Sequence, residues 1–210
     1  MIYIAHRRNT IAELENTPTK YGIEVDIRSN NGRLIIHHDP FRLGEDFEAW
    51  LKSYQHQTLI LNVKEEGLEA TVIDLMRHYH IENYFFLDQS FPFLVKWSSL
   101  GERRCAVRFS EFESIETALK LAGKIDWVWV DCFNHFPLSS RDAKLLTAAG
   151  FRLCLVSPEL QGRIAEIEIP LLAKLLHDCL IKPTAICTKR PEIWERCMDN
   201  INRSSQNIHE

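Results

Sequence analysis

Four residues within the first forty positions of the chain have the types and the spacing of an acid–base or metal-binding site. His6 and His38 lie on either side, in sequence, of Glu24 and Asp26. Glu24 and Asp26 are separated by a single residue, and alternate side chains of a strand share one face. In a strand, both carboxylates would therefore point in the same direction, with a histidine in the segment before them and another in the segment after.

A strand that presents Glu24 and Asp26 on one buried face needs a positive partner for them. The two carboxylates repel each other, and removing them from water is costly. A hard divalent cation, Mg2+ or Ca2+, takes oxygen ligands and would supply the charge. The alternative is a buried ion network in which the carboxylates pair with Arg7, Arg28 or Lys64.

His6 and His38 also admit two interpretations. A single histidine near the end of a strand commonly makes a structural hydrogen bond. Two histidines beside paired carboxylates form a narrower pattern, because imidazole exchanges a proton near neutral pH and can act as general base or general acid. The four residues together predict a metal-assisted active site for acid–base chemistry.

Eight short runs rich in β-branched or aromatic residues predict the strands that position these side chains. The predicted strands are residues 2–5, 23–28, 58–64, 84–87, 105–109, 127–132, 153–156 and 185–188. A further strand at 33–38 is expected to pair with 23–28, because Asn30-Asn31-Gly32 is typical of a hairpin turn.

Longer stretches with helical periodicity separate these runs. Apolar residues at positions 68, 72, 75 and 76, for example, lie on one face of a helix. The predicted helices are residues 45–54, 68–79, 91–100, 115–122, 141–149, 164–176 and 191–201, with one more within 9–21.

Alternating strands and helices predict a parallel sheet with right-handed crossovers. Eight such units in 210 residues predict a single domain over residues 1–210 with an α/β fold, the (β/α)8 or TIM barrel. An open, doubly wound sheet is the alternative. In a barrel the chemistry lies at the C-terminal ends of the strands, which is where the four residues above fall.

Composition argues against several classes of protein. The net charge is -4 and no cluster of Lys and Arg stands out, so we expect no nucleic-acid binding. No apolar run approaches the roughly 20 residues of a membrane span. The strand-like run that starts at Ile2 leaves no room for a signal peptide, and the six cysteines form no C-x-x-C pair. These features predict free thiols and a cytoplasmic location.

The order of the motifs resembles the signature of the glycerophosphodiester phosphodiesterases. The resemblance is carried by His6-Arg7, Glu24-x-Asp26, Asn30-Asn31-Gly32 and His38-Asp39-Pro40. The segment 59–64 is similar to the family's third strand, which commonly ends in E-x-K. The resemblance covers about the first third of the chain by motif. It implies a TIM barrel of the PLC-like phosphodiesterase type, a divalent cation (magnesium or calcium) and a place in lipid metabolism.

The resemblance also implies roles for individual residues. His6 and His38 match the family's two catalytic histidines. Arg7 and Lys64 match residues that contact the phosphate, for which a planar guanidinium and a point charge are both suited. Other polar residues after strand ends, such as Asp88, could line the pocket, but each is interpreted first as a cap or loop residue. Arg108 is the exception, since it is our further candidate for phosphate binding.

Glu24 and Asp26 match two metal ligands of the family, but the third differs. Asn62 stands where the family has a carboxylate. An amide oxygen can still bind Mg2+ or Ca2+ without contributing charge, so the resemblance implies weaker metal binding or recruitment of Glu65. The chain also resembles a compact member of the family, because only residues 41–44 stand where many members carry the insertion that covers the glycerol site. Asn9 is expected to replace an asparagine of the family's segment after its first histidine.

The sequence therefore predicts a phosphoric diester hydrolase that acts on a soluble glycerophosphodiester-like small molecule. A cyclic phosphate would form first, and an enzyme that released it would be a lyase. One alternative is a non-catalytic barrel that binds a phosphate ligand and has lost a metal ligand at Asn62. Another is a carbonyl lyase that uses the amine of Lys64. The oligomeric state stays open.

Overall fold

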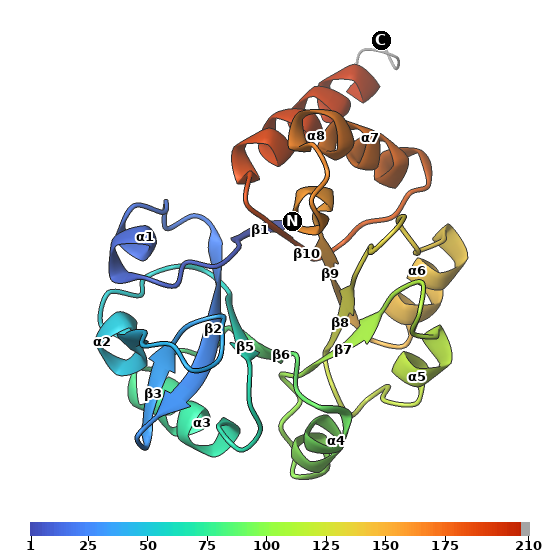
Figure 1. Cartoon of the computed structure of the whole chain (residues 1–210). Helices are drawn as coiled ribbons and strands as arrows, with labels where there is room; N and C mark the ends of the chain where they lie inside the picture. Colours follow the sequence, from blue (N-terminus) through green and yellow to red (C-terminus); the bar gives the residue numbers. More distant parts are fainter. Residues whose placement is uncertain (207–210) are drawn as a thin grey trace. The chain divides into compact units, whose positions relative to one another are not determined.

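The computed structural model describes residues 1–206 of the chain (Figure 1). These residues divide into two compact units. The N-terminal unit comprises Ile4–Val107 and Lys124–Trp127. Of the described residues, the C-terminal unit comprises 1–3, 108–123 and 128–206. A single domain over residues 1–210 stays a prediction.

Strands and helices alternate along both units, and all eight predicted strands are present. The strands are β1 (Ile2–Ala5), β2 (Gly22–Asn30), β3 (Arg33–Ile36), β4 (Glu45–Asp46), β5 (Leu59–Val63), β6 (Tyr84–Leu87), β7 (Ala106–Phe109), β8 (Trp127–Val130), β9 (Arg152–Val156) and β10 (Ala185–Thr188). The two strands beyond the predicted eight core strands are β3, which was expected, and β4, which was not.

Each predicted helix is also present, with shifted ends in several cases. The helices are α1 (Ile11–Glu15), α2 (Phe47–Leu51), α3 (Glu69–His78), α4 (Phe91–Ser99), α5 (Ile115–Leu119), α6 (Ser140–Ala148), α7 (Ala165–Asp178) and α8 (Pro191–Gln206), with a short 3-10 helix at Pro158–Gln161.

In the N-terminal unit, β2 is the central strand. It pairs in parallel with β1 and β5, and β5 pairs in parallel with β6. Its second half turns back into β3 as an antiparallel hairpin. Asn31 and Gly32 have φ angles of 51° and 77°, and two successive positive φ angles are typical of a type I′ turn. The predicted hairpin is thereby confirmed.

The predicted helix at 45–54 is shorter than expected because its first residues belong to the sheet. Glu45 and Asp46 pair with Ile36 and Ile35 of β3. The Asp46 carboxylate then accepts a hydrogen bond of 2.9 Å from the backbone N–H of Ala49, so Asp46 caps α2. A residue that both ends a strand and begins a helix is not distinguished by periodicity alone.

In the C-terminal unit, β9 and β10 are parallel neighbours and helices α7 and α8 pack against each other. Ile169 of α7 and Trp194 of α8 are fully buried. All six cysteines are free, as predicted. None of the helices within residues 1–206 combines the length and the apolar character that crossing a bilayer requires.

Glu111 orders the loop that follows β8. Its carboxylate accepts hydrogen bonds from the backbone N–H groups of Phe133, Asn134 and His135, at 3.2, 2.6 and 2.7 Å. Burial alone would raise the pKa of Glu111, but these donors outweigh it and hold the pKa at about 2. The ionised carboxylate therefore stabilises the folded loop.

We predict that Glu111→Gln lowers the free energy of unfolding by about 1–3 kcal/mol at neutral pH, because strong acceptors are lost from three backbone donors. The pKa of Glu111 is depressed on folding, so its contribution is complete above about pH 4.5 and is lost as the pH falls toward about 2. Urea unfolding of both proteins at several pH values measures this, with the exposed Glu116→Gln as the control. An equal difference between wild type and variant at pH 7 and pH 3 would contradict the assignment.

Candidate active site

The candidate site is built on β2, which carries Glu24 and Asp26 into the interior of the N-terminal unit. Their exposed fractions are 1% and 0%. The register places Asp26 directly beside Asn62 of β5. Because alternate residues of a strand share a face, Asn62 and Lys64 extend toward the same side as the two carboxylates. The predicted alternation thus brings four polar residues together from two neighbouring strands.

Both oxygens of Glu24 accept hydrogen bonds. Oε2 accepts from the backbone N–H of Arg7 at 2.7 Å, and Oε1 accepts from the side-chain amide of Asn62 at 2.8 Å. Burial, together with repulsion from Asp26, nevertheless raises the pKa of Glu24 to about 7, against the opposing effect of these hydrogen bonds and of Lys64. An additional positive charge nearby would stabilise the ionised form of Glu24.

Asp26 lies between two cations and an asparagine. Lys64 Nζ is 3.4 Å from Oδ1, and Arg7 Nε is 3.5 Å from Oδ2. The side chain of Asn9 donates to Oδ2 at 2.8 Å, and its own oxygen accepts from the backbone N–H of Asp26 at 3.0 Å. Asn9 therefore binds both the side chain and the backbone of Asp26, a more specific role than its position in the sequence predicted.

Lys64 also contacts Asp88, which the sequence had suggested was a cap or loop residue. The two charged groups are 3.0 Å apart. Asp88 directly follows β6, so its place after a strand end was the available signal. Asp88 has a φ of 59° and Arg7 a φ of 50°, both in the left-handed region that residues other than glycine seldom adopt. Backbone strain of this kind concentrates at functional sites, where surrounding contacts hold it in place.

The two histidines stand along the same edge of β2. The backbone N–H of Arg8 bonds to the carbonyl of Glu24, and that of His37 bonds to the carbonyl of Asp26. His6 Nε2 lies 3.8 Å from Glu24 Oε2. His38 is more exposed, and its Nδ1 lies 2.8 Å from the Asp39 carboxylate. The hydrogen bond to His38 lowers the pKa of Asp39, and the ionised carboxylate orients the imidazole.

The ion-network alternative is present in part. Arg7 and Lys64 pair with Asp26, as that interpretation expected. Arg28 does not join them, because its guanidinium donates to the backbone carbonyls of His38 and Lys64. Arg28 therefore fixes the segments that follow β3 and β5.

Arg108 belongs to the C-terminal unit, where it contacts three residues of the same unit. Its guanidinium lies 2.6 Å from Asp131 and 3.8 Å from Glu113. It also faces the ring of Phe133 at 5.8 Å. The role of Arg108 in binding phosphate stays a prediction.

The residues beside Glu24 and Asp26 fit a hard cation through oxygen ligands. No group of three His, Cys, Asp or Glu side chains within residues 1–206 is arranged to hold a metal ion. The amide oxygen of Asn62, however, is buried and has no hydrogen-bond partner in the described part of the chain. Rotating this amide by half a turn would present the oxygen where the nitrogen now meets Glu24, and a cation there would satisfy both groups.

Comparison with known proteins identifies the fold. No family model matches the sequence, and no curated protein matches it. One similar structure is assigned as a glycerophosphoryl diester phosphodiesterase of Agrobacterium tumefaciens, with a TM-score of 0.70 and 12% identity over 97% of this chain and 99% of that one. A glycerophosphodiester phosphodiesterase of the same species has a TM-score of 0.66 and 15% identity, over 95% and 99% of the two chains.

The likeness to both structures spans nearly the whole chain and shows that it has the (β/α)8 barrel fold of the glycerophosphodiester phosphodiesterases. The predicted fold class and the predicted resemblance are confirmed at the level of fold. Function has to be argued from the site itself, because one fold serves many chemistries.

We predict that Asn9→Ala lowers the free energy of unfolding by about 1–3 kcal/mol, because a buried carboxylate and a backbone N–H each lose a partner. Chemical denaturation measures the change. Asn16→Ala is the matched control, because Asn16 is exposed and ends α1 with its backbone alone. Equal stabilities of the two variants would show that Asn9 does not support Asp26.

Proposed function

We propose that this protein is a phosphodiesterase that cleaves a small glycerophosphodiester-like molecule with the help of a divalent cation, Mg2+ or Ca2+. The observation that carries the proposal is the buried pair Glu24 and Asp26, beside an amide oxygen of Asn62 that lacks a hydrogen-bond partner among the described residues. The fold shared with two phosphodiesterase structures supports it. A cytoplasmic location and the absence of nucleic-acid binding stay predictions.

Glu24, Asp26 and Asn62 would hold the cation. When bound, it would neutralise negative charge that develops on a phosphate oxygen. When Glu24 is ionised, the site contains three carboxylates and two cations, so one negative charge remains for a divalent ion to balance. The carboxylates are Glu24, Asp26 and Asp88, and the cations are Arg7 and Lys64. Asn62 adds an oxygen ligand without adding charge, which predicts weak binding of the ion.

Arg7 and Lys64 are suited to orient the phosphate. The Arg7 side chain is 41% exposed and can present paired N–H donors to two phosphate oxygens. Lys64 is held between Asp26 and Asp88, so its ammonium has a fixed position. Both groups lie within reach of the carboxylates and would favour the added charge of a pentacoordinate transition state.

His6 and His38 would move the protons. One histidine takes the proton from a substrate hydroxyl, whose oxygen forms a bond to phosphorus. The bond from phosphorus to the leaving oxygen breaks, and the other, protonated histidine gives that oxygen a proton. The products are a cyclic phosphate and an alcohol. Water can then open the ring to give a monoester, with the two histidines exchanging their roles as general acid and general base.

A non-catalytic phosphate-binding barrel is the second candidate, and the orientation of Asn62 favours it. The Asn62 amide donates to Glu24, while Lys64 and Arg7 already accompany Asp26. The carboxylates are thus partly compensated without a metal. This candidate predicts ligand binding that does not depend on Mg2+ or Ca2+.

Phosphorus NMR with soluble diesters, beginning with glycerophosphodiesters, tests the proposal. We expect a new monoester or cyclic-phosphate resonance in the presence of Mg2+ or Ca2+, and we expect it to be absent with EDTA. The identity of the product separates hydrolase from lyase. A folded protein that yields no product from any diester with either metal would favour the binding candidate.

Replacing either histidine should abolish turnover without unfolding the protein. We predict that His6→Ala and His38→Ala each lower the rate by about 10²–10⁴-fold, the range typical of a lost general acid or base. His177→Ala serves as the control, since His177 lies on α7 of the C-terminal unit and contacts Asp178. Circular dichroism verifies folding. Wild-type rates in a folded double variant of His6 and His38 would eliminate the proposed roles.

Restoring a carboxylate at position 62 should strengthen metal binding. Without metal, Asn62→Glu should unfold at a lower temperature than wild type, because a third buried carboxylate adds repulsion. Mg2+ or Ca2+ should then raise its unfolding temperature by more than it raises that of wild type. Asn62→Leu, which has no ligand atom, is the control. If metal stabilises the Glu and Leu variants equally, the ion does not bind beside residue 62.

A further inference from the structure

A polar cavity lies in the N-terminal unit, at the N-terminal ends of strands whose C-terminal ends carry the candidate active site. Its volume is about 400 Å³. It is lined by residues from the end of α3, from the start of β6 and from the segment before β7, including Met76, Tyr84 and Arg104. The candidate site, in contrast, uses residues that follow the C-terminal ends of strands, such as Asp88 after β6. The two places are therefore separate within this unit.

Tyr84 supplies the unusual feature of this cavity. Its side chain is only 3% exposed, and its hydroxyl has no hydrogen-bond partner among residues 1–206. Burial, reinforced by Glu102, raises the pKa of Tyr84, so the hydroxyl stays protonated at neutral pH and can donate. Buried polar groups are nearly always satisfied. A buried hydroxyl without a partner in the described chain, on a residue that lines the cavity, therefore points to a partner that enters the cavity.

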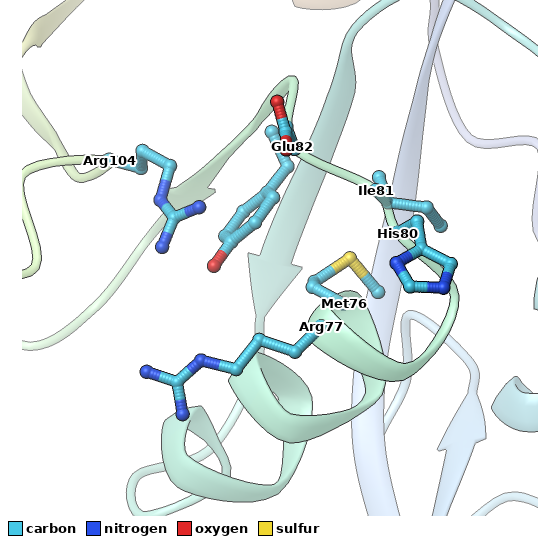
Figure 2. A pocket seen from close by; sticks show the side chains of 7 residues that line it. Met76, Arg77, His80, Ile81, Glu82 and Arg104 are labelled. Atoms are coloured by element: carbon cyan, nitrogen blue, oxygen red, sulfur yellow. The ribbon is translucent and has the colours of Figure 1, made fainter.

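Two guanidinium groups accompany this hydroxyl. Arg104 lies over the ring of Tyr84, with its central carbon 4.2 Å from the ring centroid. Its Nε and one terminal nitrogen bind Glu102 at 2.7 Å, which fixes the plane of the group. Arg77 is 74% exposed and makes an exposed contact of 3.4 Å with Asp74. Figure 2 shows Arg104 and Arg77 extending from different segments on the same side of the cavity.

The remaining wall combines apolar and polar groups. Met76 and Ile81 provide apolar surface, and His80 and Glu82 lie at the rim (Figure 2). The lining thus contains two arginines and one carboxylate. Glu102 balances the charge of Arg104, so Arg77 is the guanidinium that remains for an added anion. A small anion with an apolar part would use these contacts: a hydroxyl donor, two guanidinium groups and a thioether.

We propose that this cavity binds a small organic anion, whose carboxylate or phosphate oxygen accepts from Tyr84 and pairs with Arg77 and Arg104, while its apolar part lies on Met76 and Ile81. The proposal is independent of diester cleavage, because none of these residues belongs to the candidate active site.

Methyl NMR of methionine-labelled protein reads this cavity directly. The chain has three methionines, at positions 1, 76 and 198, and only Met76 lines the cavity. We expect titration with inorganic phosphate or with butyrate to shift the Met76 methyl resonance saturably at millimolar concentration and to leave the other two in place. The tighter of the two probes identifies the oxyanion. If neither probe shifts Met76 saturably, the proposal is wrong.

Two variants assign the contacts. Tyr84→Phe should weaken binding of the probe by about 10- to 100-fold, as expected for a hydrogen bond to a charged group. Arg77→Gln should also weaken it, whereas the control Arg103→Gln should not, because Arg103 pairs with Asp126 and does not line the cavity. Unchanged affinity in Tyr84→Phe would overturn the proposal.

Thermal unfolding of the free protein gives an independent check. Tyr84→Phe removes a hydroxyl that has no partner in the described residues, so its unfolding temperature should equal or exceed that of wild type. Added probe should then stabilise wild type and leave the variant unchanged. A clear loss of stability in the free variant would show that the hydroxyl already has a structural partner, which also overturns the proposal.

Discussion

Glu24 and Asp26 lie side by side on a buried strand, and the need to compensate their charge organises much of the N-terminal unit. An ionised carboxylate that leaves water loses several kcal/mol of solvation, and a second one nearby adds repulsion. The compensation comes from two places, the segment after β1 and the strand β5. The parallel pairing of β1, β2 and β5 brings both places to the carboxylates, so the sheet register and the electrostatics depend on each other.

Compensation also shapes the backbone. The N–H of Arg7 reaches Glu24 while Arg7 adopts a left-handed conformation, and Asp88 meets Lys64 from the same kind of conformation. Each such residue costs of order 1–3 kcal/mol. The hydrogen bond from Arg7 to Glu24 and the ion pair of Asp88 with Lys64 offset that cost, which links the strain at Arg7 and Asp88 to the candidate site.

The sequence predicted the parts of the site that follow from strand periodicity. A period of two places Glu24 with Asp26 on one face. The resemblance to the phosphodiesterase motifs singled out Asn62 and Lys64 in the next strand. The fold class followed from the alternation of strands and helices. The paired hydrogen bonds of Asn9 and the contact of Asp88 with Lys64 did not follow, because both depend on where separate loops meet. The side-chain orientation of Asn62 could not be predicted from the sequence either, because it is set by the carboxylate it faces rather than by its neighbours in sequence.

Strand β6 shows how one short element can serve two chemical environments. Its last residues are followed by Asp88, which contacts Lys64 at the candidate site. Its first residue, Tyr84, lines the opposite cavity, and the residues between them are buried and apolar. In barrels of this kind the C-terminal strand ends carry chemistry and the N-terminal ends serve stability. A buried hydroxyl without a partner among the described residues costs stability, so Tyr84 does not serve the stabilising role expected at the N-terminal end of a strand. A ligand that bonds to this hydroxyl would explain why it is there.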